Sequence, residues 1–525
     1  MSKRSSNTIF FIGVAAAIGV LIGSVLDFNK SASVSLFSNN TQEVKIKRLI
    51  NYIAYDYVDE VNTDSLLDNT INLLLKNLDP HSVYIPKSEL QSIQESMNGS
   101  FYGIGIQFRM IRDSVTVLNI IKGGPSEKAG LLAGDRILIA DKDTLFGKDY
   151  TSNKIMEFLK GKEKNNISLT IYRKQNREEL AFSFNRGKVN LISVPISFML
   201  SDKIGYIQVE RFAKNTYDEF LTALKTLKAE GMQTLVLDLR GNTGGYMDIA
   251  NDIADEFLKD GKLIVFTKNK GGKITNSMAT SKGIYEENKV YVLIDEQSAS
   301  ASEIVAGALQ DNDRGIIVGR RSFGKGLVQQ EMDLGDGSAI RLTTARYYTP
   351  TGRSIQKPYN HTGNKNYFKD LKNRNFSGEL LYKDSIHVID SLKFTTPKGK
   401  IVYGGGGIIP DVFIPIDTTG YLPAFHYGNI NNFVFDFIDK DRKKYSNLTW
   451  EDFDKSIDFD TALSEYIQSN SSDYHKKISK SAPMKIFIKA LFARELFGDT
   501  GYFRVYEKKD KMLLKVLELE EGLVK

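Results

Sequence analysis

The sequence contains no cysteine and only 11 prolines among its 525 residues. The lack of cysteine excludes disulfide bonds, thiol catalysis, thiolate metal sites and a lipid anchor carried by a cysteine. Few prolines and 26% charged residues argue against long disordered tracts. The formal net charge of +6 is small for this length and is spread along the chain, so we expect no nucleic-acid partner. The length predicts two to four domains.

Long uncharged stretches are also rare, but one lies near the N-terminus. Lys3 and Arg4 precede an uncharged run from Ile9 to Leu26, which as a helix would span roughly 27 Å, enough for a bilayer core. Basic residues before such a segment keep the N-terminus in the cytoplasm. A signal peptide cleaved around Ser31 to Ser33 is the alternative. Because the run is long for a signal core, we favour a retained anchor, with the rest of the chain exported to the periplasmic side of the inner membrane.

Two different patterns follow this segment and a polar linker that ends at residue 40. Apolar residues recur at helical spacing between Ile46 and Leu78, which predicts a small helical domain over residues 41–96. From Phe101 the pattern changes to short strands and glycine turns, with alternating runs at Phe101 to Phe108 and Ser114 to Ile120.

The region over residues 97–186 resembles a PDZ domain. The resemblance rests on the order and spacing of Pro125 to Leu131, Gly134 to Leu138 and a helix beginning near Ser152. It implies that an extended C-terminus binds by strand addition, with its carboxylate held by backbone N–H groups of one loop. That loop would consist of Gly103, Ile104, Gly105 and Ile106. A glycine-bearing hairpin in an unrelated β domain is the alternative.

Residues 187–415 have the pattern of an α/β domain. Leu235 to Leu239, Val290 to Ile294 and Gly315 to Val318 are continuous apolar runs, as expected of strands buried on both faces. Helical stretches at Met247 to Leu258 and Ser302 to Leu309 lie between them, which predicts an α/β core. The remaining residues, 416–525, are predicted to form a helical C-terminal extension.

The segment Ser298 to Glu303 follows one of these buried strands and opens a helix. Such a turn can hold a nucleophilic serine beside helix N–H groups that stabilise a developing oxyanion. A purely structural interpretation is also available, because Ser300 and Glu303 have the spacing of a capping box.

A serine nucleophile needs a base, and the five histidines lie outside the predicted core. They are therefore expected to be surface or capping residues: His81, His361, His387, His426 and His475. A lysine can replace histidine if apolar surroundings lower its pKa. Lys325 follows the strand that begins at Gly315, and Gln329 lies four residues later, where its side chain could orient the amine.

The same loop allows a different interpretation. Gly319 to Lys325 matches the Gly-x4-Gly-Lys part of a phosphate-binding loop after a strand. The serine or threonine that would bind magnesium is replaced by Gly326, which disfavours a nucleotide site.

A glycine-rich turn, Asp238 to Gly245, leaves another buried strand and enters a helix. It lacks the Gly-x-Gly-x-x-Gly pattern of dinucleotide binding. A backbone donor from this turn, together with the Ala301 amide, would form an oxyanion hole.

Taken in order, these motifs resemble the C-terminal processing peptidase, or tail-specific protease, family over about residues 45–415. The resemblance also includes Leu78 to Ser82, Phe323 to Gly326 and Tyr348 to Gly352. It implies a crotonase-like α/β serine protease core preceded by a PDZ domain.

The resemblance implies a Ser-Lys dyad of Ser300 and Lys325, with Gln329 assisting. Ser300 is chosen over Ser298 and Ser302 because it is the middle serine of the run. The oxyanion glycine falls on Gly244 or, less favoured, on Gly245.

The implied activity is endoproteolysis near the C-termini of exported proteins, with no cofactor or metal and with peptide tails as partners. A homo-oligomer or an adaptor is a further possible partner. One departure from the family pattern is that Gly407 to Asp411 lies behind an insertion after Tyr359. The alternative functions are a catalytically inactive PDZ scaffold that binds C-termini and, third, a nucleotide hydrolase.

Overall fold

The computed structural model of the protein describes residues 41–359, 367–418, 424–445, 447–469 and 482–522. The chain divides into two compact units at the boundary between Thr70 and Ile71. In the first unit, α2 (Thr41–Tyr55) is followed by α3 (Thr63–Lys76), which continues across the boundary. The predicted anchor over residues 9–26 lies outside the described residues. Within the described residues, every helix is too short or too polar to cross a bilayer.

In the second unit, residues 106–185 form an antiparallel sheet with strand order β3-β4-β5-β7-β8, and β6 pairs with β5. The alternating residues Val115 and Val117 of β4 point into a core that α6 closes with Ile155 and Leu159. The Thr151 side chain accepts a hydrogen bond from the N–H of Lys154 and thereby caps α6. The element bounds are α4 (Lys87–Asn98), β2 (Ser100–Gly103), β3 (Ile106–Ile111), β4 (Ser114–Ile120), α5 (Pro125–Ala129), β5 (Arg136–Ala140), β6 (Asp143–Thr144), α6 (Ser152–Leu159), β7 (Asn166–Arg173), β8 (Glu178–Asn185) and β9 (Gly187–Asn190).

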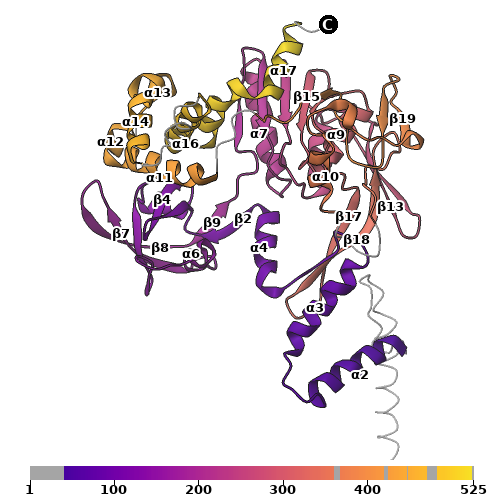
Figure 1. The fold of residues 1–525 in the computed structure, drawn as a ribbon, viewed down its shortest axis with the longest axis horizontal. Coiled ribbons are helices and arrows are strands. Elements are labelled where there is room, and N and C mark those ends of the chain that lie inside the picture. The colour runs from indigo at the N-terminus through magenta and orange to yellow at the C-terminus, as the bar shows by residue number, and fades with distance from the viewer. Residues whose placement is uncertain (1–40, 360–366, 419–423, 446, 470–481, 523–525) are drawn as a thin grey trace, which may run out of the picture. The chain divides into compact units, whose positions relative to one another are not determined.

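The α/β core contains a sheet with strand order β10-β11-β12-β15-β16-β21, parallel from β11 onward. Strand β15 of this sheet is labelled in Figure 1. Leu235 and Leu237 of β12 pack with helices α7, α8 and α9, whereas Val236 packs with Met512 of α17 (Lys511–Glu520). Helices therefore cover both faces, which explains the continuous apolar strands. The bounds are β10 (Ile196–Met199), β11 (Ile204–Gln208), α7 (Thr216–Ala229), β12 (Thr234–Asp238), α8 (Met247–Asp255), β15 (Lys289–Ile294), α9 (Ala301–Asp311), β16 (Ile316–Gly319) and β21 (Val412–Phe413).

A second sheet, with strand order β1-β18-β13-β14 and β17 paired to β18, lies beside the loop that carries Lys325. Strand β1 comes from the chain before the PDZ-like region, and its Val83 lies opposite Arg341 of β18. The sequence pattern, which suggested only helices in residues 41–96, did not predict this strand. The bounds are β1 (Val83–Ile85), β13 (Leu263–Asn269), β14 (Ile274–Met278), β17 (Leu327–Asp333) and β18 (Ala339–Tyr348).

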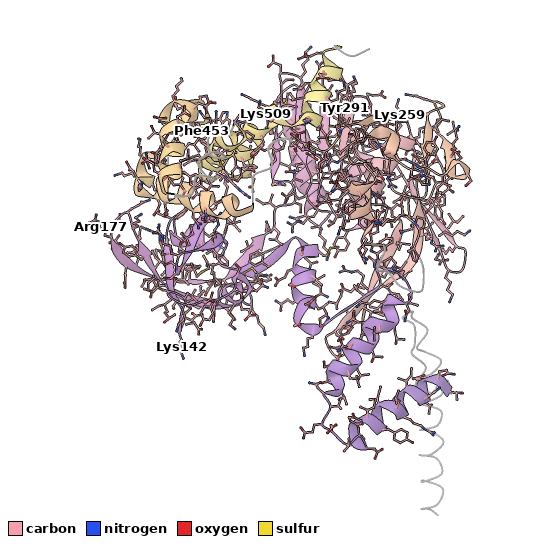
Figure 2. All side chains as sticks on the ribbon, viewed as in Figure 1. Lys142, Arg177, Lys259, Tyr291, Phe453 and Lys509 are labelled. Carbon is pink, nitrogen blue, oxygen red and sulfur yellow. The ribbon has the colours of Figure 1, made fainter. Side chains whose placement is uncertain are left out.

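The insertion after Tyr359 and the C-terminal extension complete the second unit. The extension has its own core, which includes Phe453, whereas Tyr291 of β15 lies in the core between the sheet and α17 (Figure 2). The bounds in the insertion are α10 (Asp370–Phe376), η2 (Lys383–Ser385), η3 (Asp390–Leu392), β19 (Lys393–Thr395) and β20 (Ile401–Tyr403). The bounds in the extension are α11 (Ala424–Lys440), α12 (Arg442–Tyr445), α13 (Trp450–Ser456), α14 (Phe459–Ser469), α16 (Ala482–Tyr506), η4 (Glu507–Lys509) and α17 (Lys511–Glu520).

The predicted fold class is confirmed: an α/β core is preceded by a PDZ-like β domain and followed by a helical extension. One detail differs from the expectation. The run Phe101 to Phe108 is two strands, β2 and β3, separated by Ile104 and Gly105. Gly105 has a positive φ of 80°, a conformation that favours glycine and turns the chain between the strands.

Candidate active site

Ser300 lies at the turn between β15 and α9, with backbone angles of φ 56° and ψ −112°. A positive φ at a residue other than glycine costs about 1–3 kcal/mol and is found most often at functional sites. The turn is held in place from behind, because the N–H of Ala299 donates to the carbonyl of Asn242 at 3.0 Å. The chain thus leaves a buried strand, turns sharply at the serine and enters a helix at Ala301.

The three serines of this segment have different environments. The Ser298 hydroxyl is fully buried and donates to the carbonyl of Leu239 at 2.8 Å. The Ser302 hydroxyl is also fully buried and donates to the carbonyl of Asn242 at 2.8 Å. Ser300, in contrast, lines a cavity of about 730 Å³. Of the three, Ser300 is the serine that a substrate can reach.

Lys325 lines the same cavity, from the loop between β16 and β17. Its Nζ donates a hydrogen bond to Gln329 Oε1 at 2.8 Å, and Gln329 Nε2 donates to the carbonyl of His81 at 2.6 Å. Burial lowers the pKa of Lys325 from 10.5 to about 8, and the positive charge of Arg341 contributes in the same direction. A substantial neutral fraction is therefore present near physiological pH.

The structure brings the predicted dyad residues to one cavity, but the two side chains do not bond to each other. Among the hydrogen bonds of the described residues, none joins Ser300 Oγ to Lys325 Nζ, whose partner is Gln329. Long or misaligned catalytic hydrogen bonds are common before substrate binds, so this geometry leaves both roles open.

Glu303 connects the two segments. Its carboxylate is fully buried and accepts four hydrogen bonds. One oxygen accepts from the Ser322 hydroxyl at 2.5 Å and the N–H of Gly324 at 2.7 Å. The other accepts from the N–H of Ser300 at 2.9 Å and the N–H of Lys325 at 2.8 Å. Burial raises its pKa above the ordinary value, and these hydrogen bonds oppose that rise.

Sequence reasoning assigned Glu303 only a capping role. The sequence did contain a sign of a larger role for Glu303. A carboxylate within the apolar helix α9 is expected to be buried, and a buried carboxylate needs hydrogen-bond partners. Tyr347 of β18 was missed altogether. Its hydroxyl contacts the carbonyls of Ser300 at 3.1 Å and Lys325 at 2.8 Å, which links the same two segments a second time. Nothing in its local pattern distinguishes it from other strand tyrosines.

The expectation that all five histidines are surface or capping residues was wrong for His81. Its imidazole shares a hydrogen bond of 2.8 Å with the hydroxyl of Tyr367, and its carbonyl orients Gln329. Burial, followed by the charge of Lys325, lowers the pKa of His81 to about 3. The ring is therefore neutral at physiological pH and adds no charge beside the lysine. His361 and His475 lie outside the described residues.

The predicted oxyanion donors also lie at this cavity. Ala301 is the first residue of α9, and Gly244, Gly245 and Ala301 all line the cavity with Ser300. A Cβ on Gly244 would lie 2.8 Å from Ser300 Cβ, so only glycine permits this approach. The N–H of Gly244, however, already donates to Asn242 Oδ1 at 2.8 Å and is not free in this structure. Within the described chain, the N–H groups of Gly245 and Ala301 have no partner.

The loop predicted to hold a peptide carboxylate lies between β2 and β3. The carbonyl of Ile104 accepts from the N–H of Ser126 at 2.9 Å, and the carbonyl of Gly105 accepts from the N–H of Ile121 at 3.0 Å. The N–H groups of Ile104 and Gly105 donate to no other group in the described part of the chain. Gly103 pairs with Gly187 in β9, and Ile106 opens β3.

The phosphate-loop interpretation does not fit the structure. A phosphate site requires free backbone N–H groups in the loop. Here the N–H groups of Gly324 and Lys325 donate to the buried carboxylate of Glu303, which already supplies the negative charge.

Comparison with known families agrees with this architecture. The model of peptidase family S41 matches residues 203–361, and a PDZ-domain model matches residues 103–183. A family of unknown function, DUF8443, matches residues 423–498 in the helical extension.

Curated relatives extend the match. The carboxy-terminal processing protease CtpB of Bacillus subtilis is 36% identical over 318 residues, which are 60% of this chain and 65% of that protein. The carboxy-terminal-processing protease of Bartonella bacilliformis is 35% identical over 332 residues, which are 61% of this chain and 75% of that protein. The chain belongs to the carboxy-terminal processing protease family.

The family assignment made from the ordered motifs is thus confirmed, and the chain is a PDZ-containing member of a serine protease family. The match spans just under two thirds of the Bacillus subtilis protein. The solved structure of the photosystem II D1 C-terminal processing protease is 25% identical and covers 70% of this chain and 86% of its own, with a TM-score of 0.37.

Proposed function

We propose that the protein is a serine endopeptidase in which Ser300 is the nucleophile and Lys325 the general base. The observation that carries the proposal is the contrast among the three serines. Ser298 and Ser302 are buried and bound to backbone carbonyls, whereas Ser300 shares its cavity with a partly buried lysine. A neutral amine beside a reachable hydroxyl is the arrangement that a Ser-Lys mechanism needs.

In the proposed reaction, Lys325 Nζ takes the proton of Ser300 Oγ while that oxygen attacks the scissile carbonyl. The tetrahedral oxyanion accepts hydrogen bonds from the Ala301 amide and from one amide of the glycine turn. Within that turn, Gly245 has the free donor, and Gly244 could donate only after it releases Asn242. Lys325 then gives its proton to the leaving amine, and a water activated by the same lysine hydrolyses the acyl-enzyme.

Gln329 has a positioning role in this proposal. Its Oε1 accepts from Lys325 Nζ, and its own amide is held by the carbonyl of His81. A fixed acceptor keeps the amine at the cavity wall with its lone pair available when it is neutral. A rotation of the lysine side chain toward Ser300 would then complete the dyad.

We further propose that the PDZ domain captures the C-terminus of the substrate. The free N–H groups of Ile104 and Gly105 support this, because a carboxylate there would gain two charge-assisted hydrogen bonds. Gly103 and Ile106 would flank the bound end. The substrates are proposed to be exported proteins, with the enzyme anchored by residues 9–26 on the periplasmic side of the membrane. An adaptor or self-association could add a further level of control.

Cleavage of an unstructured peptide with a free C-terminal carboxylate by the full chain would test the proposal. Ser300→Ala should abolish turnover while peptide affinity stays within about twofold. Lys325→Arg should also be inactive, because a guanidinium cannot accept a proton near neutral pH. Lys259→Arg is the matched control, since Lys259 is an exposed lysine of the same domain, paired with Glu287. Turnover that survives in Ser300→Ala would refute the assignment.

The alternative is a scaffold that binds tails without cutting them. It predicts peptide binding by the wild-type chain with no Ser300-dependent product at any pH between 7 and 9.

A further inference from the structure

The insertion between Tyr359 and Gly407 places a buried arginine behind the loop that carries Lys325. Arg374 of α10 is only 3% exposed. Its Nη1 donates to the carbonyls of Arg321 at 3.2 Å and Ser322 at 2.8 Å, and its Nη2 donates to the carbonyl of Phe323 at 3.3 Å. One guanidinium therefore holds three consecutive carbonyls that precede the base by two to four positions.

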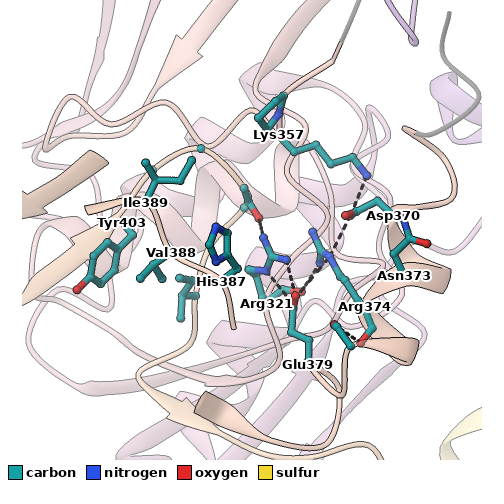
Figure 3. A pocket seen from close by; sticks show the side chains of 17 residues that line it. Arg321, Lys357, Asp370, Asn373, Arg374, Glu379, His387, Val388, Ile389 and Tyr403 are labelled. Atoms are coloured by element: carbon teal, nitrogen blue, oxygen red, sulfur yellow. Dashed lines mark hydrogen bonds and ion pairs between the residues drawn. The ribbon is translucent and has the colours of Figure 1, made fainter. Parts of the chain in front are cut away.

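A second contact from the insertion holds the same loop. Glu379 binds the Arg321 guanidinium through two hydrogen bonds of 2.6 Å each, and Arg321 also donates to the carbonyl of Gly406 at 2.9 Å. Figure 3 shows Glu379 between the guanidinium groups of Arg321 and Arg374. Arg374 Nε lies 3.0 Å from a carboxylate oxygen of Asp370, so its charge is balanced within the insertion.

The loop is thus held by two buried groups of opposite charge. The Glu303 carboxylate accepts hydrogen bonds from three donors of the loop, which are the Ser322 hydroxyl and the N–H groups of Gly324 and Lys325. The Arg374 guanidinium donates hydrogen bonds to three carbonyls of the same loop. A loop fixed through both its donors and its acceptors has little freedom to rotate, so the direction in which Lys325 leaves it is defined.

Arg374 does not touch the reaction cavity. It lines a separate cavity of about 330 Å³ with Lys357, His387 and the Gly404 to Gly407 run, whereas Ser300 and Lys325 line the larger one. Any effect of Arg374 on chemistry must therefore pass through the backbone of the loop.

We infer that Arg374 is a positioning residue for the general base, supplied by an insertion that lies outside the family pattern. This inference rests on the proposed function. Without Arg374 the loop carbonyls lose their buried donors, the loop can move outward, and Lys325 is less often aligned with Ser300. Substrate binding depends on the PDZ domain and the cavity walls, so it should be little affected.

The charged and polar side chains around Lys325 come from several elements. Glu303 comes from α9, Gln329 from β17 and Arg341 from β18, while Asp79 and His81 come from the chain before β1. None of them is bonded to Arg374. Arg374 does interact with Glu303 through charge, so a change in the pH profile reports altered burial or placement of the lysine only where it is also seen in Arg374→Lys, which keeps the positive charge.

The test compares Arg374→Ala and Arg374→Lys with wild type, using peptide turnover against pH. Lys372→Ala is the matched control, because Lys372 is an exposed cation two residues away on the same helix. We expect Arg374→Ala to lower kcat at least tenfold with KM within about threefold, and to move the alkaline rise of kcat to higher pH. Arg374→Lys should recover part of kcat, since an ammonium can hold one or two of the three carbonyls. Lys372→Ala should match wild type.

If Arg374→Ala does not fold, Arg374→Lys and Glu379→Gln carry the comparison, since both keep a cation at residue 374. A folded Arg374→Ala with wild-type kcat and pH profile would overturn the inference while leaving the proposed function intact. Equal loss of kcat and of peptide affinity would also overturn it, because that pattern indicates general unfolding. Absence of Ser300-dependent turnover in the wild type would overturn the proposed function itself, and the inference with it.

Discussion

Glu303 and Lys325 carry opposite charges, yet they meet through the backbone N–H of the lysine and not through its ammonium group. The carboxylate accepts from that N–H at 2.8 Å, while Nζ points to Gln329 Oε1 at the same distance. The negative charge of Glu303 does act to raise the pKa of Lys325, but burial outweighs it. The carboxylate therefore fixes the backbone of Lys325 without forming an ion pair that would keep its amine protonated.

The first prediction concerns pH. The reactive form of Lys325 is the neutral amine, so a lowered pKa increases the active fraction as pH rises. With a pKa of about 8, roughly 9% of the lysine is neutral at pH 7, against roughly 0.03% at the ordinary value. We expect kcat/KM for a peptide to rise about tenfold between pH 7 and pH 9.

The same profile separates lysine from histidine as the base. His81 has a pKa of about 3 and stays neutral throughout this range, so the pH–rate profile should show no titration step near pH 6.5. A rate that is flat from pH 7 to pH 9, with a fall centred near 6.5, would contradict Lys325 as base.

The second prediction concerns Glu303→Gln. An amide retains one acceptor oxygen, but its NH2 group would face two N–H or O–H donors that now lack a partner. Each unsatisfied buried donor costs about 1–3 kcal/mol, so the free energy of unfolding should fall by roughly 2–6 kcal/mol. Turnover should be lost together with the loop geometry. Urea unfolding and peptide cleavage measure the two effects.

Ser322→Ala provides the comparison for Glu303. It removes one of the four hydrogen bonds but leaves the carboxylate and both loop N–H groups paired. We expect it to retain measurable turnover. Equal loss of activity in Ser322→Ala and Glu303→Gln would contradict the view that the hydrogen bonds to the loop N–H groups hold Lys325 in place.

The third prediction separates chemistry from stability among the serines. Ser302→Ala leaves the carbonyl of Asn242 with one partner fewer and should lower stability by about 0.5–1.5 kcal/mol, with turnover within a few fold. Ser300→Ala should instead abolish turnover, and its cost in stability should not exceed that of a helix cap, about 1 kcal/mol, because the Ser300 side chain caps α9. Loss of activity in Ser302→Ala without any loss of stability would contradict Ser300 as the nucleophile and favour Ser302.

The elements that local pattern determines were predicted from the sequence. The apolar runs of β12, β15 and β16 identify buried strands by themselves, and the motif order placed Ser300 and Lys325 in one family site. Glu303 was read only as a cap because its loop partners lie about twenty residues downstream and meet it through tertiary structure. The sequence around Arg374 shows no clear periodicity, and the acceptors of its side chain are backbone carbonyls, which leave no trace in a sequence.

The last prediction concerns the contact between the PDZ domain and the helical extension. Asp439 of α11 is 6% exposed. It accepts from Arg136 Nη2 at 2.5 Å and from Lys174 Nζ at 2.9 Å, both of the PDZ domain. Burial acts to raise its pKa, but these two partners hold the pKa below the ordinary value. Asp439→Asn removes the charge that both cations need.

Removing one partner of a buried ion pair typically costs about 3–5 kcal/mol, because the other charge is left uncompensated. We therefore expect Asp439→Asn to lower the thermal unfolding midpoint and to make the PDZ domain more accessible to limited proteolysis. The control lies in the same contact: Arg112 pairs with Asp436 at 2.6 Å, but its side chain is 77% exposed. Arg112→Ala should cost less than about 1 kcal/mol, because water screens an exposed pair. If the two variants behaved alike, Asp439 would not be what holds the extension to the PDZ domain.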